Sequence, residues 1–181
     1  MVQKPVKHDI EPIFAANSLV LVLGTMPSPQ SRRQGFYYAH PQNRFWPVLA
    51  RVFGEPEPER QDIPAKRSLI IRQRLALWDV LAECSIDGAA DSSIRRPRPN
   101  NLPALISRTQ IRAVFCTGLK AYQLYQRLCA PQTHIPAVRL PSTSPANRRI
   151  SDDGLFDAYR QIKATRDMLI TRAACTKVFF T

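Results

Sequence analysis

The chain has 181 residues, 44% of them apolar, which suits one globular domain over residues 1–181 with a sizeable core. Lys and Arg number 26 against 14 Asp and Glu, so the net charge of +12 favours nucleic acid as the partner over an acidic membrane surface. No apolar stretch could cross a bilayer and residues 1–9 lack a signal-peptide core, so we expect a cytoplasmic protein that binds no membrane. Net charge alone does not locate the charges, and a purely solubilising role is the alternative.

The cysteines are widely and irregularly spaced. No C-x-x-C pair of the kind that precedes zinc, iron–sulfur or redox sites is present. We expect reduced, mostly buried thiols and no metal. The four positions are Cys84, Cys116, Cys129 and Cys175.

The first clear element is the apolar run SLVLVL at residues 18–23, which predicts a strand buried on both faces. Residues 24–43 lack helical periodicity and are rich in Pro, Ser, Gly and Tyr, so we expect a long loop, which in compact domains is usually functional. Apolar residues at helical spacing then predict a helix over residues 45–53. Asn43 would be its N-cap, Pro47 would lie close to its first turn and Gly54 would end it.

The middle of the chain alternates polar connections with short apolar runs. Residues 55–64 predict a surface connection and residues 65–74 a helix. The run LALWDVL at 75–81 fits either a strand or a helix, and we interpret it as a strand. Residues 85–101 predict another polar connection, followed by a short helix over 102–107.

The last third of the chain supplies two more strands. IRAVFCT at residues 111–117 is a clear strand, and Gly118 turns the chain into a helix with one apolar face. A short strand at 137–140, a second loop at 141–149 and a helix at about 155–170 follow, whereas residues 172–181 fit no pattern. The alternation predicts an α/β fold, a three-layer α/β/α arrangement around a mainly parallel four-stranded sheet. Ligands of such folds bind at the carboxyl ends of the strands, where both loops begin.

The two loops carry the most specific pattern in the sequence. The first reads GTMPS from Gly24 and then GFYYAHPQNRFW from Gly35, and the second reads LPSTSPANR from Leu140. Together they resemble the two active-site motifs of the uracil-DNA glycosylase superfamily, and are most similar to its hypoxanthine-DNA glycosylase branch. LWDVL and DSSIR, at residues 77–81 and 91–95, resemble that branch more weakly.

This resemblance implies a monofunctional DNA N-glycosylase of base-excision repair. Such an enzyme flips a deaminated base out of DNA, hydrolyses its N-glycosidic bond and leaves an abasic site. Hypoxanthine is the first candidate base and uracil the second. We expect a monomer that acts on damaged double- or single-stranded DNA and uses no cofactor.

The resemblance assigns catalysis to Asn43, whose carboxamide would orient the attacking water. The mismatch-specific uracil and thymine glycosylases of the superfamily hold this water with an asparagine of the first motif, where the present sequence has Thr25. A threonine lacks an amide that accepts from water and donates elsewhere at once, so the resemblance moves the catalytic role to Asn43. The alternative is that Asn43 only caps its helix.

The base pocket is predicted from the first loop. Phe36 and Tyr38 are candidates for the stacking face, with core packing as the alternative for each, whereas Trp46 is assigned to the core. His40 could contact the base or a phosphate, or hold the turn before the adjacent proline. Backbone N–H groups of residues 24–28 and of the helix start would stabilise the leaving base. The predicted pocket residues are Gly24, Thr25, Met26, Pro27, Phe36, Tyr38 and His40.

Hydroxyl and basic side chains of the two loops are candidates for phosphate contacts. The predicted DNA-binding residues are Ser28, Ser31, Arg32, Ser142, Thr143, Ser144, Asn147 and Arg148. Arg33, Arg149 and the cluster of Arg95, Arg96 and Arg98 could widen this surface. Turn chemistry is the alternative for the second loop, and a solvated face for the arginines. Neither motif contains a lysine, which argues against Schiff-base chemistry and strand nicking.

Two other functions fit the sequence. One is a mismatch-specific uracil or thymine glycosylase of the same superfamily, and the other is a non-catalytic nucleic-acid-binding α/β module. The chain has neither a G-x-x-x-x-G-K-[ST] loop nor a G-x-G-x-x-G turn, which weakens a nucleotide-binding version of the module. The glycosylase hypothesis requires Asn43 and Ser142 to converge on one cavity.

Overall fold

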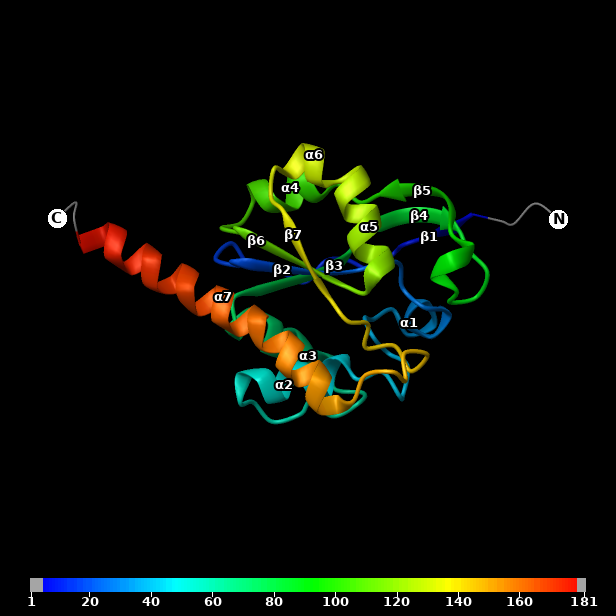
Figure 1. The fold of residues 1–181 in the computed structure, drawn as a ribbon, viewed down its shortest axis with the longest axis horizontal. Coiled ribbons are helices and arrows are strands. Elements are labelled where there is room, and N and C mark those ends of the chain that lie inside the picture. Colours follow the sequence, from blue (N-terminus) through cyan, green and yellow to red (C-terminus); the bar gives the residue numbers. More distant parts are fainter. Residues whose placement is uncertain (1–4, 179–181) are drawn as a thin grey trace.

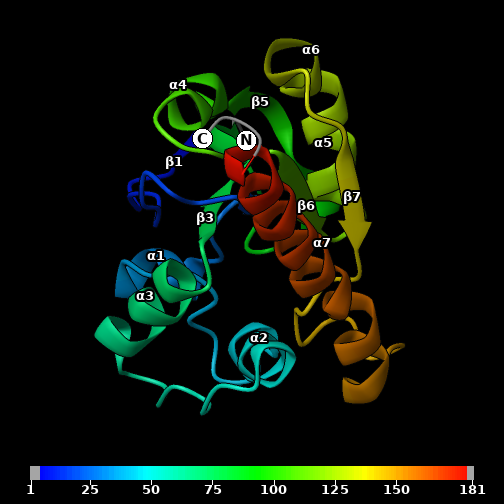
Figure 2. The same cartoon turned by 90° about the vertical axis from the view of Figure 1, so that its left-hand side faces the viewer.

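A four-stranded parallel sheet forms the centre of the computed structural model, which describes residues 5–178. Its strand order is β3-β2-β6-β7, with bounds Leu75–Asp79, Val20–Gly24, Ala113–Thr117 and Ala137–Leu140. Helices α2 (Phe45–Phe53), α3 (Ile63–Arg72) and α7 (Asp152–Val178) cover one face of the sheet. Helices α4 (Leu102–Ser107), α5 (Leu119–Leu128) and α6 (Ala130–Thr133) lie on the other (Figures 1 and 2). The predicted three-layer α/β/α fold is confirmed.

Strand β2 shows why this sheet must be covered on both sides. Val20 and Val22 belong to one apolar cluster, with residues of α2, α3 and α7, whereas Leu21 and Leu23 belong to a second, with residues of α4 and α5. All four side chains are fully buried. Successive side chains of a strand point to opposite faces, so an unbroken apolar run needs a core on each face.

A second, antiparallel sheet of three strands was not predicted. It has the order β1-β4-β5, with bounds Val6–Lys7, Leu81–Ser85 and Arg95–Pro99. Val80 alone separates β3 from β4, and the buried Asn100 side chain donates to the carbonyls of Asp79 and Leu81 on either side of it, at 2.9 and 3.1 Å. The expectation of a polar connection over residues 85–101 is therefore wrong for β5. Within residues 5–178 this edge strand pairs only with β4, and it shows no apolar alternation.

Two other expectations need correction. The first loop contains a short helix, α1 (Pro29–Gln34), which begins where the Ser28 hydroxyl accepts from the Ser31 N–H and ends at Gly35, whose φ is +63°. The last helix starts at Asp152 and continues to Val178, beyond the sheet (Figure 1), so most of residues 172–181 are helical and residues 179–181 lie outside the described part. The predictions for α2, α4, α5 and β7 are confirmed.

The carboxyl ends of the parallel strands meet at one edge of the sheet. Strands β2, β3 and β6 end at Gly24, Asp79 and Thr117, and β7 ends at Leu140, where the second loop begins. No helix among residues 5–178 is long and apolar enough to span a membrane. Three of the four cysteine thiols are buried, Cys175 is exposed, and all four are free.

Candidate active site

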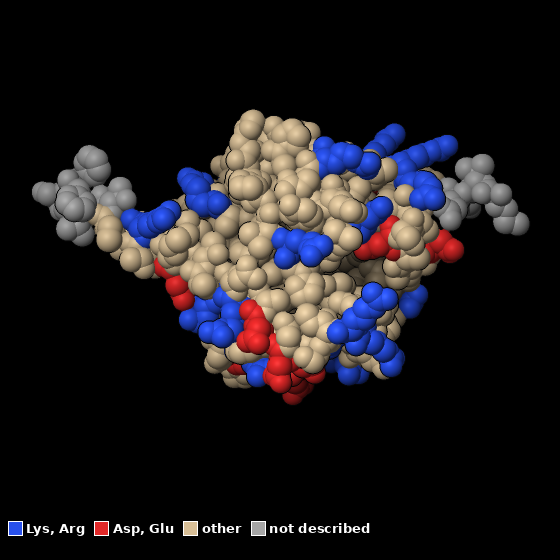
Figure 3. Space-filling model, viewed as in Figure 1, with Lys and Arg blue, Asp and Glu red and all other residues tan. Residues whose placement is uncertain are grey.

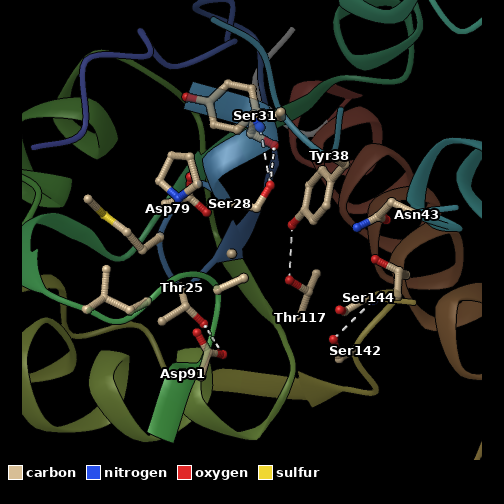
Figure 4. Close-up of a pocket in the computed structure, with 17 residues that line it drawn as sticks. Thr25, Ser28, Ser31, Tyr38, Asn43, Asp79, Asp91, Thr117, Ser142 and Ser144 are labelled. Atoms are coloured by element: carbon tan, nitrogen blue, oxygen red, sulfur yellow. Dashed lines mark hydrogen bonds between the residues drawn. The ribbon is translucent and has the colours of Figure 1, made fainter. Parts of the chain in front are cut away.

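A cavity of about 130 Å³ lies at the carboxyl ends of β2, β3 and β6 (Figure 4). Both predicted loops line it, so Asn43 and Ser142 converge as the glycosylase hypothesis requires. The last residues of the three strands form its floor. The predicted residues that line it are Gly24, Thr25, Met26, Pro27, Ser28, Ser31, Tyr38, Asn43, Ser142, Thr143 and Ser144; Tyr37, Asp79, Ile86, Ala89, Asp91 and Thr117 complete the wall.

Gly24 is required by the close packing of this floor. A Cβ atom at position 24 would lie 2.1 Å from Oδ1 of Asp79 and 3.2 Å from the hydroxyl of Tyr38. The first distance is far shorter than any van der Waals contact. The absence of a side chain at Gly24 therefore lets the Asp79 carboxylate and the Tyr38 phenol approach the end of β2.

Tyr38 is held rigidly against the cavity. Its ring stacks on Phe45 with centroids 3.8 Å apart, and its hydroxyl shares a 3.0 Å hydrogen bond with the hydroxyl of Thr117. Burial, and then the negative charge of Asp79, raise the pKa of Tyr38 well above its ordinary value, so the phenol stays protonated. With one face of the ring against Phe45, only the other is left for a planar ligand.

Asn43 combines a capping bond with a place in the cavity wall. Its Oδ1 accepts from the backbone N–H of Phe45 at 3.0 Å, at the start of α2, where Arg44 occupies the N-cap position that we predicted for Asn43. Because an N–H must donate to oxygen, this bond fixes which side-chain atom is the amide nitrogen. Figure 4 shows this nitrogen directed into the cavity. Capping and an active-site role are thus compatible in one side chain.

Arg44 joins the two loops, a role that the sequence did not reveal. Its backbone N–H donates to the Thr143 carbonyl at 3.1 Å, and its guanidinium donates to the carbonyls of Asn147 and Ile150, each at 2.7 Å. The Asn147 side chain donates to the Ser142 carbonyl at 2.9 Å. Asn147 therefore braces the second loop from within and does not line the cavity.

The remaining predicted site residues lie outside the cavity. Phe36 is buried and stacks on Trp46, so it packs in the core, which was its alternative role. His40 lines a neighbouring hollow, and its Nδ1 accepts from the Gln42 N–H at 3.1 Å, as a turn-holding residue would. Arg32 donates to the Pro27 carbonyl at 2.8 Å, and Arg148 is exposed on the second loop.

Two carboxylates were missed by the sequence reasoning. Asp79 is 4% exposed, and one of its oxygens lies 2.9 Å from Nε2 of His8. Asp91, in the short 3₁₀ helix Asp91–Ser93, accepts from the Thr25 hydroxyl at 3.1 Å. Desolvation raises the pKa of Asp91, whereas the Thr25 hydroxyl opposes this rise. An acidic residue that ends an otherwise apolar strand, as in LALWD, was the signal that could have revealed Asp79.

Charge is divided sharply between the cavity and its surroundings. Among the described residues that line the cavity, none is Lys, Arg or His, whereas two are carboxylates. Exposed arginines lie on β5 and on the second loop, and Figure 3 shows basic side chains on both sides of a hollow in this face. The interior suits a ligand with N–H donors, and the surrounding surface suits phosphates.

The sequence is similar to those of known proteins. Residues 11–164 match the sequence model of the Uracil DNA glycosylase superfamily. Two proteins named hypoxanthine DNA glycosylase are similar over most of their lengths. The one from Methanosarcina acetivorans is 32% identical, over 81% of this chain and 91% of the relative, and the one from Methanosarcina barkeri is 31% identical, over 79% and 89%.

A solved structure is similar as well. The solution NMR structure of a candidate uracil DNA glycosylase from Methanosarcina acetivorans superposes with a TM-score of 0.70 at 29% identity, covering 87% of this chain and 98% of that one. The family match spans well over half of the present sequence. The chain therefore belongs to the uracil DNA glycosylase superfamily and is a DNA N-glycosylase, a hydrolase of N-glycosidic bonds in DNA.

Proposed function

We propose that this enzyme removes hypoxanthine from DNA, and uracil less efficiently, as a monofunctional glycosylase of base-excision repair. The observation that carries the proposal is the convergence of Asn43, the second loop and Asp79 on one cavity. The names of the Methanosarcina relatives point to the same base.

The chemistry of deamination explains why a carboxylate suits this floor. Deamination of adenine or cytosine replaces an amino group by a carbonyl and turns the adjacent ring nitrogen from an acceptor into an N–H donor. Asp79, when ionised, can only accept, so it would bind the new N–H and repel the lone pair of the unmodified base. Tyr38 would stack on the same base.

Bond cleavage needs a placed water and a stabilised leaving base. In our proposal the Asn43 amide nitrogen, which faces the cavity, donates to the water and places it. The water oxygen bonds to C1′ of the sugar, the electrons of the glycosidic bond leave with the base, and the proton that the water loses ends on the departing base. The carbonyls of Gly24 and Thr25 already accept from the N–H groups of Val80 and Leu81, at 2.9 and 3.1 Å. These two carbonyls are thus engaged within the fold. The backbone N–H groups of residues 24–28 are the proposed donors to the departing base. With no lysine among the described lining residues, the proposed product is an intact abasic site.

A base-release screen tests the proposal. Duplexes with a single deoxyinosine, deoxyuridine or thymidine opposite guanine are incubated with excess enzyme, and alkali-labile sites are quantified. We expect release of hypoxanthine to be fastest, uracil to follow and thymine to be the slowest. Release of uracil or thymine alone would instead assign the mismatch-specific activity.

Salt dependence should report the phosphate contacts of the second loop. Arg148→Ala and Arg149→Ala are each expected to reduce the steepness of log K against log salt by about 0.9 for duplex DNA, if each side chain neutralises one phosphate. Arg112 is also exposed but precedes β6, at the opposite edge of the sheet. Arg112→Ala is the control. An equal slope of log K against log salt for all three variants would contradict the proposed contact of the second loop with phosphates.

A further inference from the structure

His8 lies behind the cavity floor, against the lining residue Asp79, although it comes from the start of the described chain. Its side chain is fully buried, and its Nε2 is 2.9 Å from Oδ2 of Asp79, a residue 71 positions later. Strand β1 sets this position, because Val6 and Lys7 pair with β4 and the His8 N–H donates to the Ala82 carbonyl at 2.8 Å.

The surroundings of the imidazole fix its tautomer. The Ile10 N–H donates to Nδ1 of His8 at 3.2 Å, so Nδ1 is an acceptor and the ring proton must lie on Nε2. Nε2 therefore donates to Asp79. The rings of Tyr37 and Trp78 pack around the imidazole, with centroids 6.1 and 6.5 Å away, and leave it little freedom to turn.

Only one oxygen of Asp79 is occupied by this bond. The other, Oδ1, is the atom that a Cβ at Gly24 would strike first, and Asp79 lines the cavity. A carboxylate held by one oxygen can turn its second oxygen only within a narrow range. His8 thus determines which acceptor the floor presents to a ligand.

We propose that His8 is a positioning residue for substrate selection: by donating to Oδ2, it holds Asp79 so that Oδ1 accepts the ring N–H of the flipped base. The inference rests on the proposed function. The family match begins at residue 11, so His8, which directly follows β1, lies ahead of the matched segment. Strand β1 would then support the active site, in addition to forming an edge of the second sheet.

The test compares bases that differ at the ring N–H. Single-turnover rates are measured on duplexes containing hypoxanthine or unsubstituted purine, which lacks both the N1–H and O6. The wild-type enzyme should prefer hypoxanthine strongly. His8→Phe keeps a ring but removes the donor. We expect the rate of this variant on hypoxanthine to fall at least tenfold. Its preference for hypoxanthine over purine should also shrink at least tenfold.

Rescue separates positioning from folding. His8→Gln carries an amide N–H that can reach Asp79 and should keep its rate and preference within about threefold of wild type, because hydrogen bonding to the charged group is retained. Lys7→Ala, at the exposed last position of β1 and directly before His8, is the control for disturbance of this strand. Thermal unfolding of each variant verifies that it is folded.

If His8→Phe does not fold, Asp79→Asn supplies the decisive measurement. His8 would donate to the amide oxygen and leave the amide nitrogen, a donor, facing the base, so the preference should move from hypoxanthine toward purine. An unchanged preference in folded His8→Phe or in Asp79→Asn overturns the inference, while hypoxanthine release by the wild type leaves the proposed function intact. Absence of release by the wild type would refute the proposed function itself.

Discussion

Replacement of Asn43 by alanine is expected to slow hypoxanthine release at least 100-fold in single turnover while leaving DNA binding nearly unchanged. The loss of one well-placed polar group that acts in the transition state has effects on the order of 10²- to 10³-fold. The same substitution removes the acceptor for the Phe45 N–H and should lower the free energy of unfolding by about 1 kcal/mol. Rates under saturating enzyme and chemical denaturation measure the two effects.

Asn43→Ser separates these two roles. A serine hydroxyl is a good acceptor at a helix start, so stability should return to within a few tenths of a kcal/mol of wild type. The shorter side chain cannot place an amide in the cavity, so the rate should remain as low as that of the alanine variant. A serine variant with near-normal chemistry would reduce Asn43 to a capping residue.

Gly24→Ala is expected to damage both stability and base release. The new Cβ would lie 2.1 Å from Oδ1 of Asp79, so the carboxylate must move away from its bond with His8 or the strand must shift. Overpacking of this kind costs about 1–3 kcal/mol. Displacement of the proposed acceptor should also slow hypoxanthine release at least tenfold.

Gly35→Ala provides the matched control. Gly35 has a φ of +63° and open space where a Cβ would lie, so alanine there meets backbone strain of about 1 kcal/mol but displaces no cavity group. Stability should fall while the release rate is retained. Equal rates for wild type and Gly24→Ala would contradict the described packing of the floor.

Much of the framework could be predicted because its signals are local. The run at residues 18–23 required burial on both faces, and β2 shows this. The two long loops begin where the strands end, and both line the cavity. The missed helix α1 also had local signals, since Ser28, Pro29 and Gly35 are typical of a helix start and stop.

The chemistry at the cavity floor could not be predicted in the same way. The pairing of His8 with Asp79 joins residues 71 positions apart, and no periodicity within either segment indicates it. Strand β5, with its sequence RRPRP, is formed through pairing with β4, and carries no apolar pattern of its own. Tertiary contacts decide such features, and a single sequence does not display them.

The bonds of Arg44 have a mechanical consequence. The residue next to Asn43 is fastened at three points to main-chain carbonyls of the opposite loop, those of Thr143, Asn147 and Ile150. If residues 142–144 contact a DNA strand as proposed, a displacement of the second loop would be transmitted through these three hydrogen bonds to the start of α2 and to the neighbouring Asn43 carboxamide. Strand capture and alignment of the hydrolytic water would then be a single coupled movement, shared by two segments about a hundred residues apart.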